Sequence, residues 1–263
     1  MFLRLRSYSS CGLSVLLSVL VIFLAGWEWG PGLLRIPPFI IPPLSMVYHE
    51  FLRMLAVSAL MTHTGITAAE VIVGFVLGSL LGAFFGYVLG MSPTAEFALS
   101  PYILALQIAP KVAFAPLFIL WMGFTVYPKI LVAILIVFFP VMVNVLSAIR
   151  TVDPDLINLA RAFKATRAQI FWKIEFPASL PPLFAGLRIA STLAVVGVVV
   201  GELVGGNMGL GYLLSFGEGQ ANTAMVFVAI LMLTLVGGIA YLAVILIEQR
   251  VLHYLPRRSF SAT

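Results

Sequence analysis

The sequence predicts an all-α integral membrane protein with six transmembrane helices and a helix-turn-helix hairpin on the cytoplasmic side. Hydrophobic residues make up 62% of the chain, charged residues only 10%, and the mean hydropathy is +1.11. A soluble domain usually contains about 25% charged residues. The apolar runs do not alternate with polar residues as the strands of a membrane barrel do, so the spans are expected to be helical.

Six runs are long enough to cross a hydrocarbon core, which needs about 20 apolar residues. Four of them contain no charged residue and cover 7–27, 71–92, 130–149 and 219–247. Two more contain one basic residue each: 97–128 is interrupted by Lys111 and 176–201 by Arg188. The run 7–27 has no small-residue cleavage site before Trp27, so it is expected to be a retained helix and not a signal peptide.

Basic residues predict the orientation, because cytoplasmic loops retain Lys and Arg. With the N-terminus inside, ten basic residues fall on the cytoplasmic side, namely Arg4, Arg6, Arg150, Arg161, Lys164, Arg167, Lys173, Arg250, Arg257 and Arg258. Only Arg35, Arg53 and Lys129 fall outside. Segment 1–10 is therefore expected to be a cytoplasmic N-terminus and 249–263 a cytoplasmic basic tail. The net charge of +5 reports topology and does not indicate nucleic-acid binding.

The first helix and an outer loop are expected over 11–64. The loop contains five prolines before a helical stretch at 45–61, which mixes apolar residues with His49, Glu50 and Arg53. His49 and His63 are too far apart and too poorly supported by other ligands to predict a metal site. The lone Cys11 excludes a disulfide framework within the chain.

The second span carries glycines at intervals of four residues: Gly74, Gly78, Gly82, Gly86 and Gly90. At helical spacing these lie on one stripe, along which another helix can approach closely. The partner could be a helix of the same bundle, or the stripe could face a pore or a second subunit.

Segment 150–182 is the most polar internal part of the chain, and residues 150–177 hold eight of its 25 charged residues. Asp153 before Pro154 predicts a helix start, with a carboxylate cap and proline in the first turn. Thr166 and Gln169 have the spacing of a capping box, which predicts a second helix. Such a hairpin could lie on anionic lipids or dock a soluble partner.

The hairpin resembles the cytoplasmic coupling loop of bacterial ABC importer permeases, written EAA, three residues, Gly, nine residues, Ile-x-Leu-Pro. The spacing is kept in full, with Asn158-Leu159-Ala160, Lys164 and Ile174-Glu175-Phe176-Pro177 in the motif positions. Ala160, Ile174 and Pro177 match, whereas Lys164 replaces the family's glycine, so the capping box is expected to set the turn instead. The resemblance implies that the following residues couple to an ATPase: Asn158, Leu159, Ala160, Arg161, Phe163, Lys164, Ala165, Ile174 and Pro177.

Further stretches are similar to permeases for nitrate, sulfonate and taurine, and to the branch for thiamine pyrimidine precursors. They are 108–117, 121–123, 180–190, 200–205 and 209–213. The resemblance makes 65–248 the permease core and implies a type I importer fold. It also implies ABC ATPase subunits that bind Mg-ATP, a second permease copy as a homodimer, an external solute-binding protein, and a multi-pass location in the bacterial cytoplasmic membrane among its lipids.

The chain itself is expected to bind no cofactor and to catalyse no reaction. It has no G-x-x-x-x-G-K-[ST] loop to hold ATP phosphates and no HExxH motif. The alternative function is a secondary transporter or channel for a small anion without an ATPase partner, although such proteins often show internal repeats that are absent here. A purely structural membrane protein explains neither the hairpin nor the glycine stripe.

The substrate pathway is expected near Lys111, because a lysine inside a membrane span is costly and usually faces a cavity. Gln107, Asn144 and Glu202 are the other polar residues placed there by the spans. A positive charge suits a small anion such as a sulfonate, nitrate or a phosphorylated precursor. The alternative is that Lys111 reaches an interface or pairs with Glu202 structurally.

Overall fold

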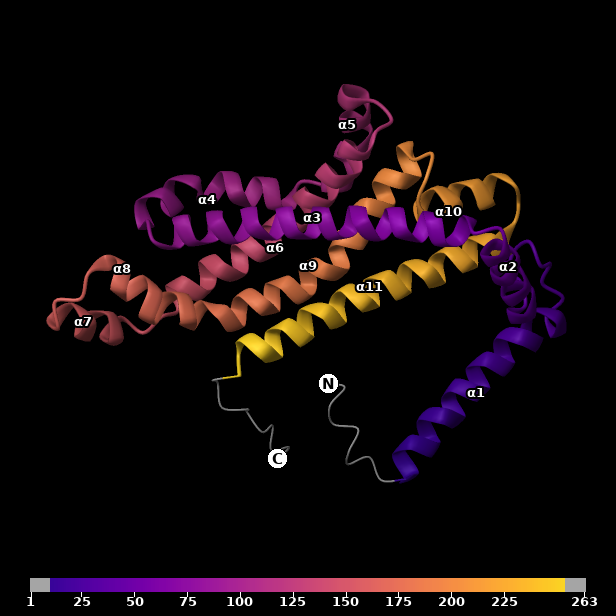
Figure 1. Ribbon diagram of the computed structural model, residues 1–263, viewed down its shortest axis with the longest axis horizontal. Coiled ribbons are helices and arrows are strands. Elements are labelled where there is room, and N and C mark those ends of the chain that lie inside the picture. Colours follow the sequence, from indigo (N-terminus) through magenta and orange to yellow (C-terminus); the bar gives the residue numbers. More distant parts are fainter. Residues whose placement is uncertain (1–9, 254–263) are drawn as a thin grey trace. The chain divides into compact units, whose positions relative to one another are not determined.

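The computed structural model describes residues 10–253, and its regular elements in that range are all helical, as the composition predicts (Figure 1). The described residues divide into two compact units. Unit 1 contains the residues up to Thr62 together with Leu213–Leu231. Unit 2 contains His63–Tyr212 and the residues from Met232 onward. The expected cytoplasmic N-terminus and most of the expected basic tail lie outside the described residues.

Unit 1 contains α1 (Ser10–Leu33), α2 (Leu44–Ala56), most of α10 (Leu210–Gly219) and the start of α11 (Thr223–Val251). Polar contacts join these elements through the connecting loop. The backbone N–H of Ser45 donates to Glu28 Oε2 (2.8 Å), and Trp27 Nε1 donates to the carbonyl of Pro42 (3.1 Å). The Trp27 ring also packs on Phe227, with centroids 5.5 Å apart.

The prediction of a helix over 45–61 is wrong at the C-terminal end, since α2 ends at Ala56. Ser58 has a φ of 58°, in the left-handed region, and breaks the helical path. The next helix, α3 (Ala59–Gly90), then begins well before the predicted start at 71. The predicted span starts only after Glu70, because a charged residue normally bounds an apolar run. In the structure Glu70 is buried and paired within the bundle, so the helix continues through it.

The span expected over 97–128 is broken. α4 (Pro93–Ile108) is followed by η2 (Lys111–Phe114) and α5 (Ala115–Met122), with a bend of 79° between the two parts. Pro110 lies at the break and has no N–H to continue the helical ladder. Pro128, expected to end this span, lies instead in the next helix, α6 (Val126–Arg150).

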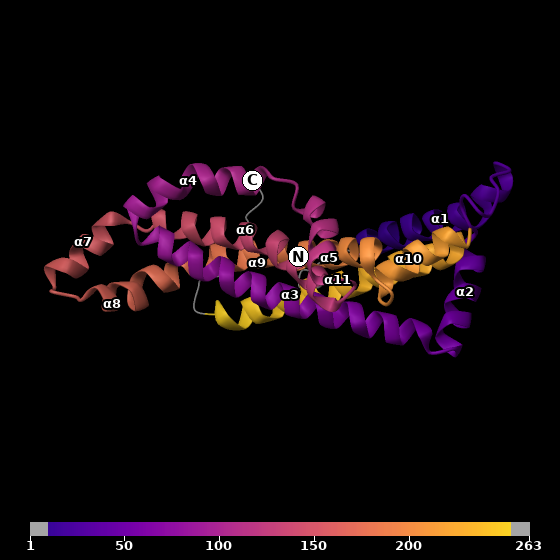
Figure 2. The same ribbon diagram turned by 90° about the horizontal axis from the view of Figure 1, so that it is seen from above.

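The core of unit 2 is formed by α6 and α9 (Phe176–Gly205), with α3 against α6 (Figure 2). Val132, Val137, Val141 and Val145 of α6 are fully buried there. The glycine stripe of α3 faces α6 along its length. A Cβ at Gly74 would lie 2.6 Å from Ala133 Cβ, and one at Gly82 would lie 2.6 Å from the carbonyl oxygen of Phe138.

The other three glycines of the stripe make the same kind of contact, Gly78 with Val137, Gly86 with Val145 and Gly90 with Ile149. The close approach that the spacing predicts is thus made to a helix of the same chain. Five helices of the described part are long and apolar enough to cross a membrane, and the broken pair makes a sixth span if counted as one.

Candidate coupling site and membrane pathway

Two short helices, α7 (Pro154–Ala162) and α8 (Arg167–Ile170), form the predicted hairpin. Both views place it at one end of unit 2, beyond the end of α6 and the start of α9 (Figures 1 and 2). Asp153 caps α7, because its Oδ1 accepts the backbone N–H of Asp155 at 2.9 Å. Thr166 and Gln169 form the predicted capping box of α8. Both helix starts predicted from the sequence are therefore confirmed.

The turn between the two helices is centred on Lys164, whose φ is 58°. The N–H of Lys164 donates to the carbonyl of Arg161 (2.8 Å), and the N–H of Ala165 donates to that of Ala160 (3.0 Å). These two bonds make a Schellman motif, in which glycine normally occupies the left-handed position. Lys164 therefore adopts the very conformation for which the importer motif has glycine, and the capping box acts in addition to it.

The hairpin continues into the membrane through η3 (Phe171–Glu175), a π-helical turn that leads directly into α9. Pro177 lies in the first turn of α9, and Ile174 is half-buried in the π-turn. Phe171 and Phe176 pack on Tyr87 of α3, with centroids 5.6 and 5.9 Å apart. The Tyr87 hydroxyl lies 2.7 Å from Ser179 Oγ. The hairpin is thus packed against α3 as well as joined to α9.

The helix α7 has two chemically different faces. Leu156, Leu159 and Phe163 lie on one face, with 50%, 56% and 80% of their surface exposed. Asn158 and Arg161 lie on the other face and line a cavity together with Ile157. Ala160 and Ala165 are half-buried.

The structure therefore separates two groups of residues that the coupling motif treats as one set. Leu159 and Phe163 present an apolar surface away from the bundle, whereas Asn158 and Arg161 point back toward the ends of the membrane helices. The resemblance to the coupling loop puts Arg161 in the same set as Leu159 and Phe163. The structure places it on the opposite side, because residues three or four apart share a face and Arg161 shares its face with Asn158 and Ile157.

At the break between α4 and η2, Lys111 folds back on the end of α4. Its Nζ donates to the carbonyl oxygens of Gln107 and, at 3.4 Å, Ala109, and it lies 4.8 Å from the centroid of the Phe139 ring. A cation at a helix C-terminus is favourable because the last carbonyls carry a partial negative charge. The side chain of Gln107 is exposed, so the break carries an exposed amide and a half-buried ammonium.

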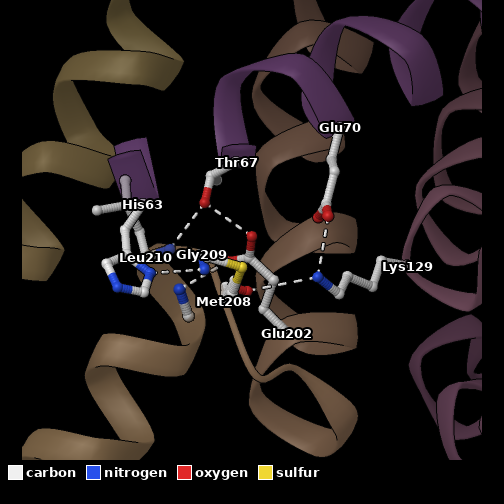
Figure 3. A network of polar contacts seen from close by, with 9 residues as sticks. His63, Thr67, Glu70, Lys129, Glu202, Met208, Gly209 and Leu210 are labelled. Carbon is white, nitrogen blue, oxygen red and sulfur yellow. Dashed lines mark hydrogen bonds and ion pairs between the residues drawn. The ribbon is translucent and has the colours of Figure 1, made fainter. Parts of the chain in front are cut away.

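The other two expected pathway residues lie in packed surroundings. Asn144 Nδ2 donates to the carbonyl of Pro140 (2.8 Å), and Asn144 packs where a Cβ at Gly186 of α9 would touch it. Glu202 is fully buried and accepts hydrogen bonds from the Thr67 hydroxyl (2.7 Å) and the Gly211 N–H (2.6 Å) (Figure 3). Lys111 forms no ion pair with Glu202 among the described residues.

The network around Glu202 joins α3, α6, α9 and the turn before α10 (Figure 3). His63 Nδ1 accepts the N–H of Gly209 (2.9 Å), and Thr67 Oγ1 accepts that of Leu210 (2.7 Å). Gly209 has a φ of 113°, and a Cβ there would lie 1.9 Å from Glu202 Oε1. Only glycine fits this position.

The same network contains an ion pair that the sequence analysis missed. Lys129 of α6, 5% exposed, donates to Glu70 Oε1 of α3 at 2.9 Å (Figure 3). Both residues flank apolar runs in the sequence, so they fall outside the predicted spans. Two opposite charges at the ends of separate apolar runs are the only signal that could have indicated the pair.

The chain has recognisable relatives. The family described as binding-protein-dependent transport system inner membrane component matches residues 78–253. The riboflavin transport system permease protein of Chloroflexus aurantiacus is 37% identical over 92% of this chain and 89% of its own length. The formylaminopyrimidine transport permease protein of Halalkalibacterium halodurans is 31% identical over 93% of this chain and 96% of its own length.

The taurine transport system permease protein of Escherichia coli is 27% identical over 89% of this chain and 87% of its own length. Among solved structures, an inward-facing MetNI methionine ABC transporter chain matches with a TM-score of 0.64 and 20% identity, over 74% of this chain and 97% of that one. The structural match supports the fold of a type I importer permease. The chain belongs to the family of binding-protein-dependent inner membrane components and is the multi-pass permease subunit of an ABC importer.

Proposed function

We propose that two copies of this chain form the pore of an importer whose two ABC ATPase subunits dock on α7, while a solute-binding protein docks on the outer side. The observation that carries the proposal is the exposed apolar face of α7, with Leu156, Leu159 and Phe163. A capped helix with such a face, held at the end of the bundle, can lay its apolar residues into a groove of a partner. Energy then enters through the partner, which binds Mg-ATP, and the permease catalyses nothing itself.

The docking face is tested by Ala160→Glu. Ala160 lies beside Leu159, so a carboxylate there would be desolvated in the groove without a partner, at a cost of several kcal/mol. We expect ATPase association and uptake to fail while the amount of permease in the membrane stays normal. The matched control is Ala168→Glu, an exposed position of α8 that the family motif leaves unspecified. Normal association of the Ala160→Glu protein would show that α7 is not the docking element.

For the imported solute we propose a small organic or inorganic molecule of the sulfonate, nitrate, taurine or pyrimidine and vitamin-precursor class. The names of three relatives support the taurine and the pyrimidine or vitamin-precursor part of this range, since they contain riboflavin, formylaminopyrimidine and taurine. Gln107 and Lys111 at the helix break are the first residues of the proposed pathway. Asn144 and Glu202 would join it only after the packing of α6 on α9 and the buried network rearrange.

Uptake of a panel of labelled anions and pyrimidines tests this pathway, with the wild type and Lys111→Met compared in the assembled importer. Loss of the ammonium should reduce uptake of an anionic solute more than uptake of a neutral one. The level of assembled complex is measured in parallel, because Lys111 also holds the end of α4. A fully assembled Lys111→Met importer that takes up every solute at the wild-type rate would remove Lys111 from the pathway.

A further inference from the structure

A cavity of about 490 Å³ lies between the hairpin and the ends of the membrane helices. It is lined from the α3–α4 junction by Met91, from the end of α6 by Ile149 and Arg150, and from the hairpin by Asn158, Arg161 and Arg167. The cavity belongs to neither the exposed apolar face of α7 nor the helix break at Lys111. No function assigned above uses it.

The charges around the cavity are unbalanced. Three arginines from α6, α7 and α8 line it, against a single lining carboxylate, Glu175. Arg150 forms an ion pair with Glu96. Arg161 and Arg167 make no side-chain hydrogen bond or ion pair with any described residue. The guanidinium groups of these two arginines are therefore available as donors. The fork of N–H groups on a guanidinium matches two oxygens of a phosphate.

Apart from Asn158, the rest of the lining is apolar. Met91, Ile149, Val152, Ile157 and Ile170 form most of it, and Ile149, Val152 and Ile170 are buried. A cavity lined both by arginines and by apolar side chains suits an amphipathic anion. We propose that this cavity binds the phosphate group of an anionic lipid of the cytoplasmic leaflet, with the lipid's glycerol and upper acyl carbons against the apolar lining. The assignment to the cytoplasmic leaflet rests on the topology proposed above. The match between the arginines and a phosphate group does not.

An acidic segment of the ATPase is the other kind of occupant, and the two faces of α7 argue against it. Leu156, Leu159 and Phe163, which carry the proposed docking, lie away from the cavity, and none of them lines it. The cavity is closed on one side by helix ends that lead into the membrane, through Gly90 and Ile149. A partner docked on the apolar face of α7 would thus leave the opposite face, which carries Arg161, free to bind the lipid.

The test is equilibrium binding of phosphatidylglycerol to the purified full chain in detergent, measured by native mass spectrometry. Phosphatidylcholine is the comparison lipid, because it has the same phosphate but a choline cation that the arginines repel. The diagnostic variant is Arg167→Gln, which leaves the Arg150–Glu96 pair intact. Lys173→Gln is the matched control, since Lys173 is an exposed base of the same hairpin that does not line the cavity.

We expect phosphatidylglycerol to bind better than phosphatidylcholine, and Arg167→Gln to weaken its binding about tenfold, the effect of losing a charge-assisted hydrogen bond. Lys173→Gln should leave it unchanged. A parallel arm titrates inorganic phosphate and follows thermal unfolding. If the Arg167-dependent effect occurs only with inorganic phosphate, the cavity binds a soluble phosphate group and not a lipid.

The site is overturned if phosphatidylglycerol binds the wild type, Arg167→Gln and Lys173→Gln equally and inorganic phosphate has no effect. It is also overturned if Arg167→Gln abolishes ATPase association without changing lipid binding, since the cavity would then belong to the ATPase. The Ala160→Glu protein, changed on the other face of α7, should bind phosphatidylglycerol as the wild type does. A failure of the coupling proposal can therefore be told from a failure of this one.

Discussion

Lys164 holds a left-handed backbone conformation that an L-residue adopts only at a cost of about 1–2 kcal/mol. The cost is accepted because the Schellman bonds and the capping box at Thr166 fix the turn from both sides. The motif spacing predicts where the turn lies. It could not reveal that Lys164 itself takes up the left-handed conformation, because the choice between a strained lysine and a rebuilt turn depends on the whole hairpin.

Replacing Lys164 with glycine should therefore stabilise the protein by about 1 kcal/mol, since glycine adopts this conformation without a Cβ penalty. Thermal unfolding of the purified chain in detergent should show a higher midpoint. The control is Lys173→Gly in the helical η3 turn, which should lower the midpoint, because glycine is unfavourable within helices. A lower midpoint for Lys164→Gly would contradict the strain argument.

The Glu70–Lys129 pair is the second residue-scale feature, and Glu70 Oε2 has no hydrogen-bond partner among the described groups. Lys129→Met would leave Glu70 buried without a counter-charge, and we expect a loss of about 3–5 kcal/mol in unfolding free energy. The double variant Lys129→Met with Glu70→Leu removes both charges and should recover most of the loss. A double variant as unstable as Lys129→Met alone would show that the pair does not account for the effect.

At the scale of elements, the glycine stripe of α3 brings its backbone against α6. The four-residue spacing predicts that some helix approaches closely. It could not identify which helix, because the sequence of α3 is the same whether its partner is α6 or a second subunit. In the structure the partner is α6, where each glycine of α3 faces a small or β-branched residue or a backbone carbonyl.

Gly82→Ala tests this contact, because its Cβ would meet the Phe138 carbonyl oxygen at 2.6 Å, and backbone cannot move aside cheaply. We expect destabilisation of about 1–3 kcal/mol, seen as a lower midpoint of thermal unfolding. Gly65→Ala in the same helix is the control, since no atom lies within 4 Å of its Cβ. It should be neutral or slightly stabilising. Equal effects of the two substitutions would refute the packing argument.

At the scale of the whole molecule, composition and apolar runs predict the helical membrane class, and the caps predict the hairpin. The break at Pro110 was missed because the run 97–128 was judged by its apolar length, whereas Pro110 has no N–H for the helical ladder. The early start of α3 was missed because Glu70 was treated as the end of an apolar run, whereas it pairs with Lys129, a partner distant in sequence. Such partners are a property of the fold and not of any window of sequence.

The proposed topology can be checked at two exposed asparagines, Asn158 on the hairpin and Asn207 in the turn after α9. Single cysteines are introduced at each position in a Cys11→Ser background. In right-side-out vesicles an impermeant thiol reagent should label residue 207 and spare residue 158, because the distribution of basic residues predicts a cytoplasmic hairpin. Labelling of both positions to the same extent would contradict the six-span arrangement.

The most direct measurement is solute uptake by proteoliposomes that contain this chain with its ATPase and solute-binding protein. We predict uptake only when all three proteins and Mg-ATP are present, unaffected by collapse of proton and sodium gradients, and abolished by Ala160→Glu. ATP hydrolysis should be absent when the permease is reconstituted alone. Uptake by the permease alone, driven by an ion gradient and insensitive to ATP, would contradict the assignment and favour a secondary transporter.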